Sequence, residues 1–390
     1  MTRTSTVGTS VPFVDLGAQQ EEVAAEVEIG LKDVFAQASF IGGPAVAEFE
    51  RAYARFLGAG NCVGVANGTD ALELALRASG VTAGAEVILP ANTFIATAEA
   101  VSRIGAVPVL VDVDPEYLLI DPERVAEAVT PRTRAIMPVH LFGQTAFVER
   151  LAPVAAACGA VIVEDAAQAH GASRHGRFAG TLGLAAGTSF YPGKNLGAAG
   201  DAGAVVTDDD DVAARVRMLG AHGSERKYQH DAIGMNSRLD TIQAVVLNAK
   251  LRRLARWNDR RRQAAARYQD MLAGLPGVAL PRTAPGNLDV WHLYVIRVAE
   301  RDRVLAALAE AGIGAGIHYP VPVHLSRAYR GLGLGPGSFP VAEQAALGML
   351  SLPLFPHISE AQQQYVADRL QAALGTKTRS PHPPGAGGEA

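Results

Sequence analysis

The sequence predicts an α/β protein with a mostly parallel sheet, and three observations support this prediction. Short apolar segments alternate with helical segments between residues 61 and 219. Glycine, proline and asparagine separate many of these segments, as is typical of turns. Hydrophobic residues make up 48% of the 390 residues, which is enough for a large core. Strands that alternate with helices form right-handed crossovers, so we expect parallel strands with both faces of the sheet covered.

The expected elements follow from the period of the apolar residues. The predicted strands are 62–66, 86–89, 107–113, 134–139, 160–163, a short strand near 187, 204–207 and 292–298. The predicted helices are 20–36, 45–57, 71–78, 95–103, 121–129, 147–157, 212–219, 236–260 with a continuation to 275, 301–311 and 365–374. We expect a flexible N-terminus over 1–10, a large domain over 11–255 and a small C-terminal domain over 256–375. The tail over 376–390 is too rich in proline, glycine and polar residues to pack.

The composition and net charge argue against several classes of function. The net charge is −4 and no dense basic cluster occurs, which argues against nucleic-acid binding. No apolar run approaches the roughly 20 residues of a membrane span, and no signal peptide is evident. The two cysteines, Cys62 and Cys158, lack a metal-ligand spacing and fit a reducing compartment. We therefore expect a soluble cytoplasmic protein without a metal site.

Lys194 stands out because its six nearest neighbours on either side carry no charge. It lies in a glycine-rich stretch that ends at a predicted strand. Burial lowers the pKa of a lysine, and a neutral amine can attack a carbonyl group. A solvent-facing loop lysine is the alternative interpretation.

Ligands of open α/β sheets bind beyond the carboxyl ends of the strands. Gly68 and Thr69 follow one strand and open a helix, where free N–H groups can bind a phosphate; an ordinary helix cap is the alternative. Asp165 ends a second strand and can hold a proton on a heterocyclic nitrogen, or simply face water. Phe94 follows a third strand and can stack on a flat ring or join the core. The Ser189 hydroxyl can contribute to the phosphate site or form a hydrogen bond with its own backbone.

These groups match the requirements of pyridoxal 5′-phosphate (PLP): a phosphate site, a stacking ring, a carboxylate for the pyridine nitrogen and an isolated lysine. Two further polar residues, Gln168 and His170, follow Asp165 closely. His170 alone reads more readily as a loop histidine with its own hydrogen bonds.

Four segments resemble the DegT/DnrJ-type nucleotide-sugar aminotransferases: Asn67-Gly-Thr-Asp-Ala-Leu72, Glu164-Asp-Ala-Ala-Gln-Ala-His-Gly171, Ser189-Phe-Tyr-Pro-Gly-Lys-Asn-Leu-Gly197 and Gly234-Met-Asn-Ser-Arg-Leu-Asp240. The resemblance implies an aspartate aminotransferase-like fold (PLP fold type I), with a smaller C-terminal α+β domain. It also implies that Lys194 forms the Schiff base, Asp165 contacts the pyridine nitrogen and Gln168 lies near the ring hydroxyl. Phosphate ligands would be Gly68, Thr69 and Ser189, with Phe94 stacked on the ring. Asn236 would reach the phosphate of the neighbouring subunit in a homodimer.

The segments 190–197, 226–230 and 317–324 are most similar to those of members that aminate C3 of dTDP-linked 3-keto-6-deoxy sugars, with L-glutamate as the expected amino donor. This likeness implies that Tyr228, His318 and Tyr319 face the sugar nucleotide. Ala202 departs from the family pattern, in which many relatives have glycine. A keto-cyclitol or C4-keto-sugar aminotransferase, and a non-catalytic sensor of the same fold, stay open as alternatives.

Overall fold

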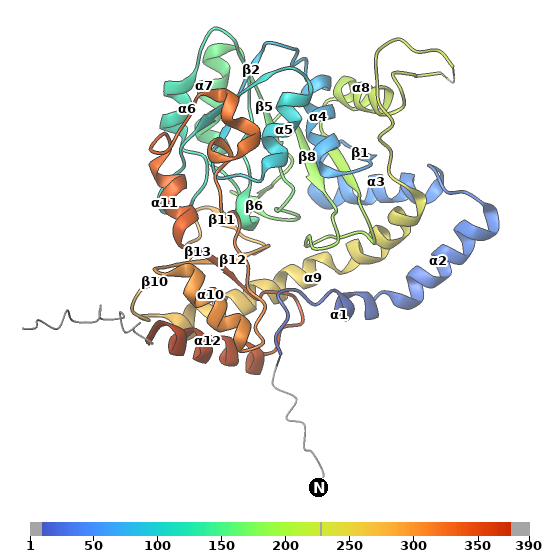
Figure 1. Ribbon diagram of the computed structural model, residues 1–390. Helices are drawn as coiled ribbons and strands as arrows, with labels where there is room; N and C mark the ends of the chain where they lie inside the picture. Colours follow the sequence, from blue (N-terminus) through green and yellow to red (C-terminus); the bar gives the residue numbers. More distant parts are fainter. Residues whose placement is uncertain (1–9, 227, 376–390) are drawn as a thin grey trace, which may run out of the picture.

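The computed structural model describes residues 10–226 and 228–375, and a seven-stranded sheet forms its centre (Figure 1). The strand order is β1-β9-β8-β5-β4-β2-β3. Only β9 runs antiparallel to its neighbours, so the expected mostly parallel sheet is confirmed. The strands are β1 (Asn61–Val65), β2 (Glu86–Pro90), β3 (Val107–Val111), β4 (Thr133–Ile136), β5 (Val161–Asp165), β8 (Ala185–Ser189) and β9 (Gly203–Thr207).

Helices cover both faces of this sheet. On one face, α4 (Gly68–Ala78), α5 (Ile95–Arg103) and α8 (Asp210–Gly220) contribute to one large apolar core with residues such as Leu74, Val101 and Val216. The opposite face packs against α3 (Pro44–Leu57), α6 (Pro122–Ala128), α7 (Val148–Cys158) and the first part of α9 (Thr241–Leu272). Parallel sheets need this double cover because their strands are apolar on both faces.

Helix α9 extends from the large sheet to a second, smaller unit (Figure 1). That unit contains the sheet β10-β12-β13 with α10 and α12, and its core includes Ala264, Tyr268 and Leu272 of α9. The remaining elements are α1 (Leu16–Glu21), α2 (Ala24–Gln37), β6 (Ser173–Arg174), β7 (Arg177–Phe178), β10 (Val278–Ala279), β11 (Asn287–Leu288), β12 (Tyr294–Val298), α10 (Arg301–Glu310), α11 (Pro340–Gly348), β13 (Met349–Leu352) and α12 (Glu360–Gly375), with short 3-10 turns at Leu141–Gly143, Val323–Leu325 and Arg327–Leu332.

The expected helix start at residue 236 is wrong, because α9 begins at Thr241. Residues 236–240 are extended and make contacts outside the helix. Asn236 forms an isolated β-bridge with Ala221, and the Ser237 hydroxyl accepts a hydrogen bond from the Ala66 N–H at 3.1 Å. The periodic pattern also did not reveal α11 or β13. The domain boundary near 255 stays a prediction, since α9 crosses it without a break. The expected loose ends at 1–9 and 376–390 lie outside the described residues.

Candidate active site

A cavity of about 670 Å³ lies beyond the carboxyl ends of β5 and β8. It is the place where the topology of an α/β sheet favours ligand binding. The predicted residues that line it are Gly68, Thr69, Phe94, Asp165, Gln168, Ser189, Lys194, His318 and Tyr319. Asp165 and Lys194, which are 29 positions apart, therefore share one cavity.

Lys194 follows β8 in a tight loop. The loop is closed by hydrogen bonds from the Lys194 N–H to the Tyr191 carbonyl and from the Ala198 N–H to the Phe190 carbonyl, each 2.8 Å. Burial lowers the pKa of Lys194 to about 8, and the nearby Asp165 carboxylate opposes this shift. A lysine with such a pKa is partly neutral near physiological pH and can act as a nucleophile or base.

Asp165 is the last residue of β5 and is buried. Its Oδ2 accepts a hydrogen bond from the Thr97 hydroxyl (2.8 Å), and its Oδ1 accepts one from the Ala167 N–H (3.1 Å). Burial raises the pKa of this carboxyl group, while these hydrogen bonds and Lys194 oppose the rise. The carboxylate is thus oriented and available to a cationic partner in the cavity.

The adjacent carboxylate, Glu164, has a structural role. Side chains alternate along a strand, so Glu164 points away from Asp165. It is fully buried, and it accepts hydrogen bonds from the N–H groups of Gly180, Leu182 and Gly183 and pairs with His140. The end of β5 therefore places the Asp165 carboxylate in the cavity, whereas the Glu164 carboxylate stabilises the fold.

The start of α4 has the features of an anion site. Asn67 caps this helix by accepting a hydrogen bond from the Asp70 N–H (2.8 Å). Among the described residues, the Gly68 and Thr69 N–H groups find no acceptor, so they are free for a ligand. A Cβ atom at Gly68 would lie 2.5 Å from Ser189 Cβ, so only glycine lets these two residues meet. Two free N–H groups and two hydroxyls then surround one space, which fits a phosphate.

Four aromatic or amide side chains, Phe94, Gln168, His318 and Tyr319, form another part of the cavity lining. Phe94 is 51% exposed and so is not a core residue; its ring packs on Tyr319 with centroids 5.2 Å apart. Gln168 accepts a hydrogen bond from the Phe142 N–H (2.6 Å) and donates one to the Tyr319 hydroxyl (3.0 Å). The His318 ring stacks on Phe13, and its Nδ1 lies within hydrogen-bond distance (2.8 Å) of the Ser351 hydroxyl.

Two predicted residues do not line the cavity of their own chain. Tyr228 is 82% exposed in the segment between α8 and α9, and Asn236 lies at the end of the same segment. Their roles stay predictions.

Other side chains were not foreseen from the sequence. Thr97 reaches Asp165 from the first turn of α5, and its position three residues after Phe94 was the available signal. The cavity is also lined by Phe13, Asn67, Tyr191, Asp201 and His292. His170 is buried beside the site, where its Nε2 lies 3.1 Å from the Thr188 hydroxyl, in accord with its structural interpretation.

A family model, the DegT/DnrJ/EryC1/StrS aminotransferase family, matches residues 21–371. The chain belongs to this family. The predicted recognition, fold class and enzyme class are therefore confirmed. A dTDP-3-amino-3,4,6-trideoxy-α-D-glucose transaminase of Streptomyces venezuelae is 48% identical over 361 residues, which cover 93% of this chain and 95% of the relative. The erythromycin biosynthesis sensory transduction protein EryC1 of Saccharopolyspora erythraea is also 48% identical, over 93% of this chain and 99% of its own length.

Solved structures agree with this assignment. The crystal structure of DesV from S. venezuelae is 47% identical, with a TM-score of 0.92, over 95% of this chain and all of that one. A Bacillus subtilis relative, NtdA, has a TM-score of 0.88 at 29% identity, covers 96% of this chain and 87% of its own, and was solved with bound pyridoxamine phosphate (PMP). The described residues contain no helix long and apolar enough to cross a membrane.

Proposed function

We propose that this chain is a PLP-dependent aminotransferase that moves an amino group from L-glutamate to the C3 keto group of a dTDP-linked 6-deoxy sugar. The observation that carries the proposal is the shared cavity of Lys194, Asp165 and the anion site at Gly68, Thr69 and Ser189. Family membership supports the reaction class, and the name of the Streptomyces transaminase supports the sugar class.

The residues present fit PLP. The free N–H groups of α4 and the Ser189 hydroxyl would hold the phosphate, and Asp165 would face the pyridine nitrogen. Phe94 would cover one face of the ring. When bound, PLP supplies an aldehyde that reacts with amines and a ring that accepts electrons.

Lys194 has two tasks in this proposal. Its neutral amine would first bind the aldehyde carbon covalently, which requires the depressed pKa caused by burial. Once an amino acid displaces it, the free amine would take a proton from the substrate carbon and return it at the next position. Asp165 would hold the ring nitrogen protonated throughout, because a carboxylate favours the adjacent positive charge.

The first experiment replaces Lys194 by Ala. The variant purified with PLP should lack the absorbance of the lysine-bound cofactor and all turnover, whereas the wild type shows both. Normal turnover in the Lys194→Ala variant would refute the assignment. A panel of dTDP- and UDP-linked keto sugars, with the position of the new amine determined by NMR, then tests the substrate and distinguishes C3 from C4 amination.

A regulatory role is the second candidate, because the relatives EryC1 and a Geobacillus stearothermophilus protein carry the names sensory transduction protein and pleiotropic regulatory protein. The intact set of Lys194, Asp165 and the anion site favours catalysis. Adding L-glutamate to the PLP form decides between them: formation of PMP supports the enzyme, and a stable PLP form supports the sensor. A keto-cyclitol substrate is tested by the same assay.

A homodimer in the cytoplasm completes the proposal. Apolar side chains are exposed on α2 and on the segment that follows α8, namely Ile29 (64%), Phe35 (64%) and Ile233 (90%). In Figure 1, α2 and the segment after α8 both project from the body of the chain. Such groups are suited to a protein partner, and a second copy would cover them and bring Asn236 to its neighbour's site. Free cysteines, Cys62 and Cys158, agree with a reducing compartment.

A further inference from the structure

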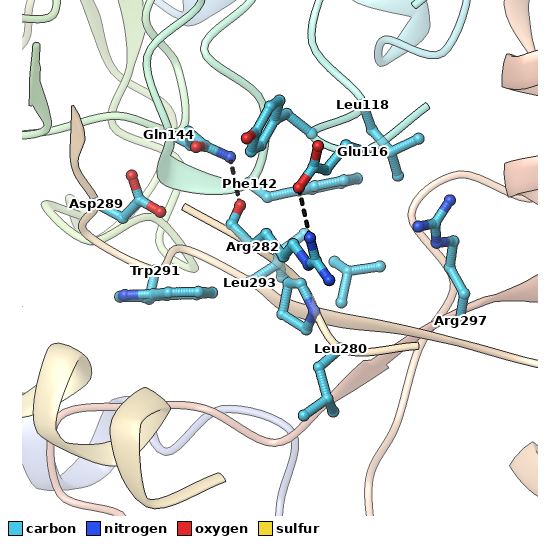
Figure 2. Close-up of a pocket in the computed structure, with 13 residues that line it drawn as sticks. Glu116, Leu118, Phe142, Gln144, Leu280, Arg282, Asp289, Trp291, Leu293 and Arg297 are labelled. Carbon is cyan, nitrogen blue, oxygen red and sulfur yellow. Dashed lines mark hydrogen bonds and ion pairs between the residues drawn. The ribbon is translucent and has the colours of Figure 1, made fainter. Parts of the chain in front are cut away.

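His292 lines the same cavity as Lys194, yet the proposed function gives it no task. It lies between β11 and β12 in a segment fixed to the loop after β4. The Val290 N–H donates to the Gly143 carbonyl (3.0 Å), and the Leu293 N–H donates to the Phe142 carbonyl (3.2 Å). Figure 2 shows the neighbours Trp291 and Leu293 with Phe142 around a second, small cavity of about 40 Å³. Trp291 thus lines the small cavity, and the next residue, His292, lines the large one.

The backbone beside His292 is strained. Trp291 has a φ of 47° and Phe142 a φ of 63°, values that side chains other than glycine rarely adopt. Such a conformation is unfavourable and persists only where the surroundings require it. The buried Arg261 stabilises the segment by donating to the carbonyls of Trp291 (3.2 Å) and Leu354 (3.0 Å). The orientation of His292 is therefore imposed by the fold.

The hydrogen bonds of Asn195 determine the protonation of the His292 ring. The Asn195 Nδ2 donates to the Asn258 Oδ1 (3.0 Å) and to the Val290 carbonyl (2.9 Å). Its Oδ1 is therefore the atom 3.2 Å from His292 Nδ1. Because an amide oxygen only accepts, Nδ1 must carry the proton. In a neutral ring, Nε2 is then an unprotonated acceptor.

The ring is neutral because burial, Lys194 and Arg261 all lower the pKa of His292 well below its usual value. Among the described residues, His292 Nε2 has no hydrogen-bond partner and is not one of the enclosed polar atoms. The titratable or charged groups around Lys194 and His292 are Asp165 from β5, His170 from the following loop, Arg261 from α9 and His318 from the small unit. Lys194 precedes Asn195, so the residue that fixes the His292 ring is joined directly to the reactive lysine.

We propose that His292 is a further catalytic residue, whose unprotonated Nε2 accepts a hydrogen bond from the Lys194 amine and directs its lone pair toward the reacting carbon. This inference rests on the proposed function. In each transfer a substrate C–H bond breaks and an N–H bond forms on Lys194, and the reverse transfer returns the proton. His292 stays neutral and gains no proton.

Two variants distinguish the contributions of the two ring nitrogens of His292. His292→Asn keeps a donor at the position of Nδ1, so it can still bond Asn195, but it lacks the Nε2 acceptor. His292→Gln places an amide oxygen near the position of Nε2. The control is His175→Asn, because His175 is exposed, lies outside the cavity and has a φ of 49°, a conformation that asparagine tolerates.

The main measurement is the rate of covalent PLP capture by the apoprotein as a function of pH, followed by absorbance. The wild-type rate should rise with a midpoint near the Lys194 pKa of about 8. His292→Asn should shift this midpoint down by about one pH unit, because a hydrogen bond to an ammonium group stabilises the charged form. It should also reduce kcat about tenfold or more. His292→Gln and His175→Asn should keep the wild-type midpoint.

Histidine ¹⁵N NMR of the wild-type apoprotein provides an independent test: Nδ1 should be protonated and Nε2 bare. The proposal is overturned if Nε2 carries the proton, if His292→Asn keeps the wild-type midpoint, or if His292→Gln shifts it equally. Should His292→Asn not fold, the NMR result and His292→Gln still decide. Failure of wild-type Lys194 to capture PLP would instead refute the proposed function itself.

Discussion

Lys194 and Asp165 depend on burial for their chemistry, and burial acts on them in opposite directions. It lowers the pKa of the lysine amine to about 8 and raises the pKa of the carboxyl group. Both shifts follow from the cost of a charge in a medium of low dielectric constant. Each residue partly offsets the other's pKa shift, so the pKa values of the two groups depend on each other.

The depressed Lys194 pKa makes the stability of the apoprotein depend on pH. Between the folded pKa of about 8 and the ordinary lysine pKa of 10.5, the folded state binds fewer protons than the unfolded state, so stability falls as pH decreases through this window. Lys194→Met removes the penalty and keeps an apolar stem. We expect it to raise the free energy of unfolding of the apoprotein by up to about 3 kcal/mol below pH 8, with no gain above pH 10.5. Urea denaturation at several pH values measures this, and an equal gain at all pH values would contradict it.

Thr97 should govern the charge state of Asp165. Thr97→Val removes a hydrogen bond to the carboxylate, of a kind that contributes about 1.5–3 kcal/mol, and so raises the pKa of Asp165 further. The pyridine nitrogen would then be protonated less readily, and we expect kcat to fall about tenfold. Thr97→Ser keeps the hydroxyl and is the matched control. Equal kcat values for the two variants would contradict this role.

At the scale of elements, the start of α4 combines a structural role with the proposed binding role. Asn67 caps the helix, while the N–H groups of the next two residues find no acceptor in the described part of the chain and are available to an anion. The packing of Gly68 on Ser189 joins the ends of two sequence segments more than 100 residues apart. The proposed phosphate site therefore depends on the alignment of α4 with β8.

Substitutions of Asn67 separate these two roles. Asn67→Ala removes the cap and should lower the free energy of unfolding of the apoprotein by about 1 kcal/mol. Asn67→Asp keeps a capping oxygen and should leave this stability nearly unchanged, but its charge would repel the phosphate and weaken PLP affinity. Thermal unfolding of the apoprotein and PLP titration measure the two effects. Unchanged PLP affinity in Asn67→Asp would argue against the phosphate site.

At the scale of the whole molecule, the cavity lies where the large sheet meets the smaller unit. Gly68, Asp165 and Lys194 come from the large sheet, whereas His318, Tyr319 and Leu352 come from the C-terminal part of the chain. Helix α9 connects the two and also holds the lysine loop, because Lys250 donates to the Gly197 carbonyl at 2.9 Å. Movement of one unit relative to the other would therefore alter the site.

Subunit exchange tests the shared active site. A Lys194→Ala chain and an Asn236→Ala chain should each have little activity alone. If Asn236 serves the partner's site, their heterodimer contains one intact site and recovers about half the activity of the wild-type dimer. Separately tagged chains, co-expressed and purified through both tags, provide the measurement. No recovery would show that Asn236 acts within its own chain, and full activity of the Asn236→Ala chain alone would show that it has no role.

Local sequence by itself determined the class of fold, most strands and helices, and the residues at the strand ends. Lys194, Asp165, Gly68 and Ser189 were predictable because parallel strands bring their carboxyl ends to one edge, whatever the packing around them. The start of α9 was not predictable, because residues 236–240 are held by bonds to Ala66 and Ala221 and not by helical period.

Tertiary structure alone decided what surrounds each reactive group. Thr97 meets Asp165 across 68 positions, and His292 meets Asn195 across 97. No local pattern encodes such contacts, since they form only when the sheet and helix α9 have packed. Burial decided the rest: the same lysine would be an ordinary surface cation in water, and its pKa is lowered because the fold removes its solvent.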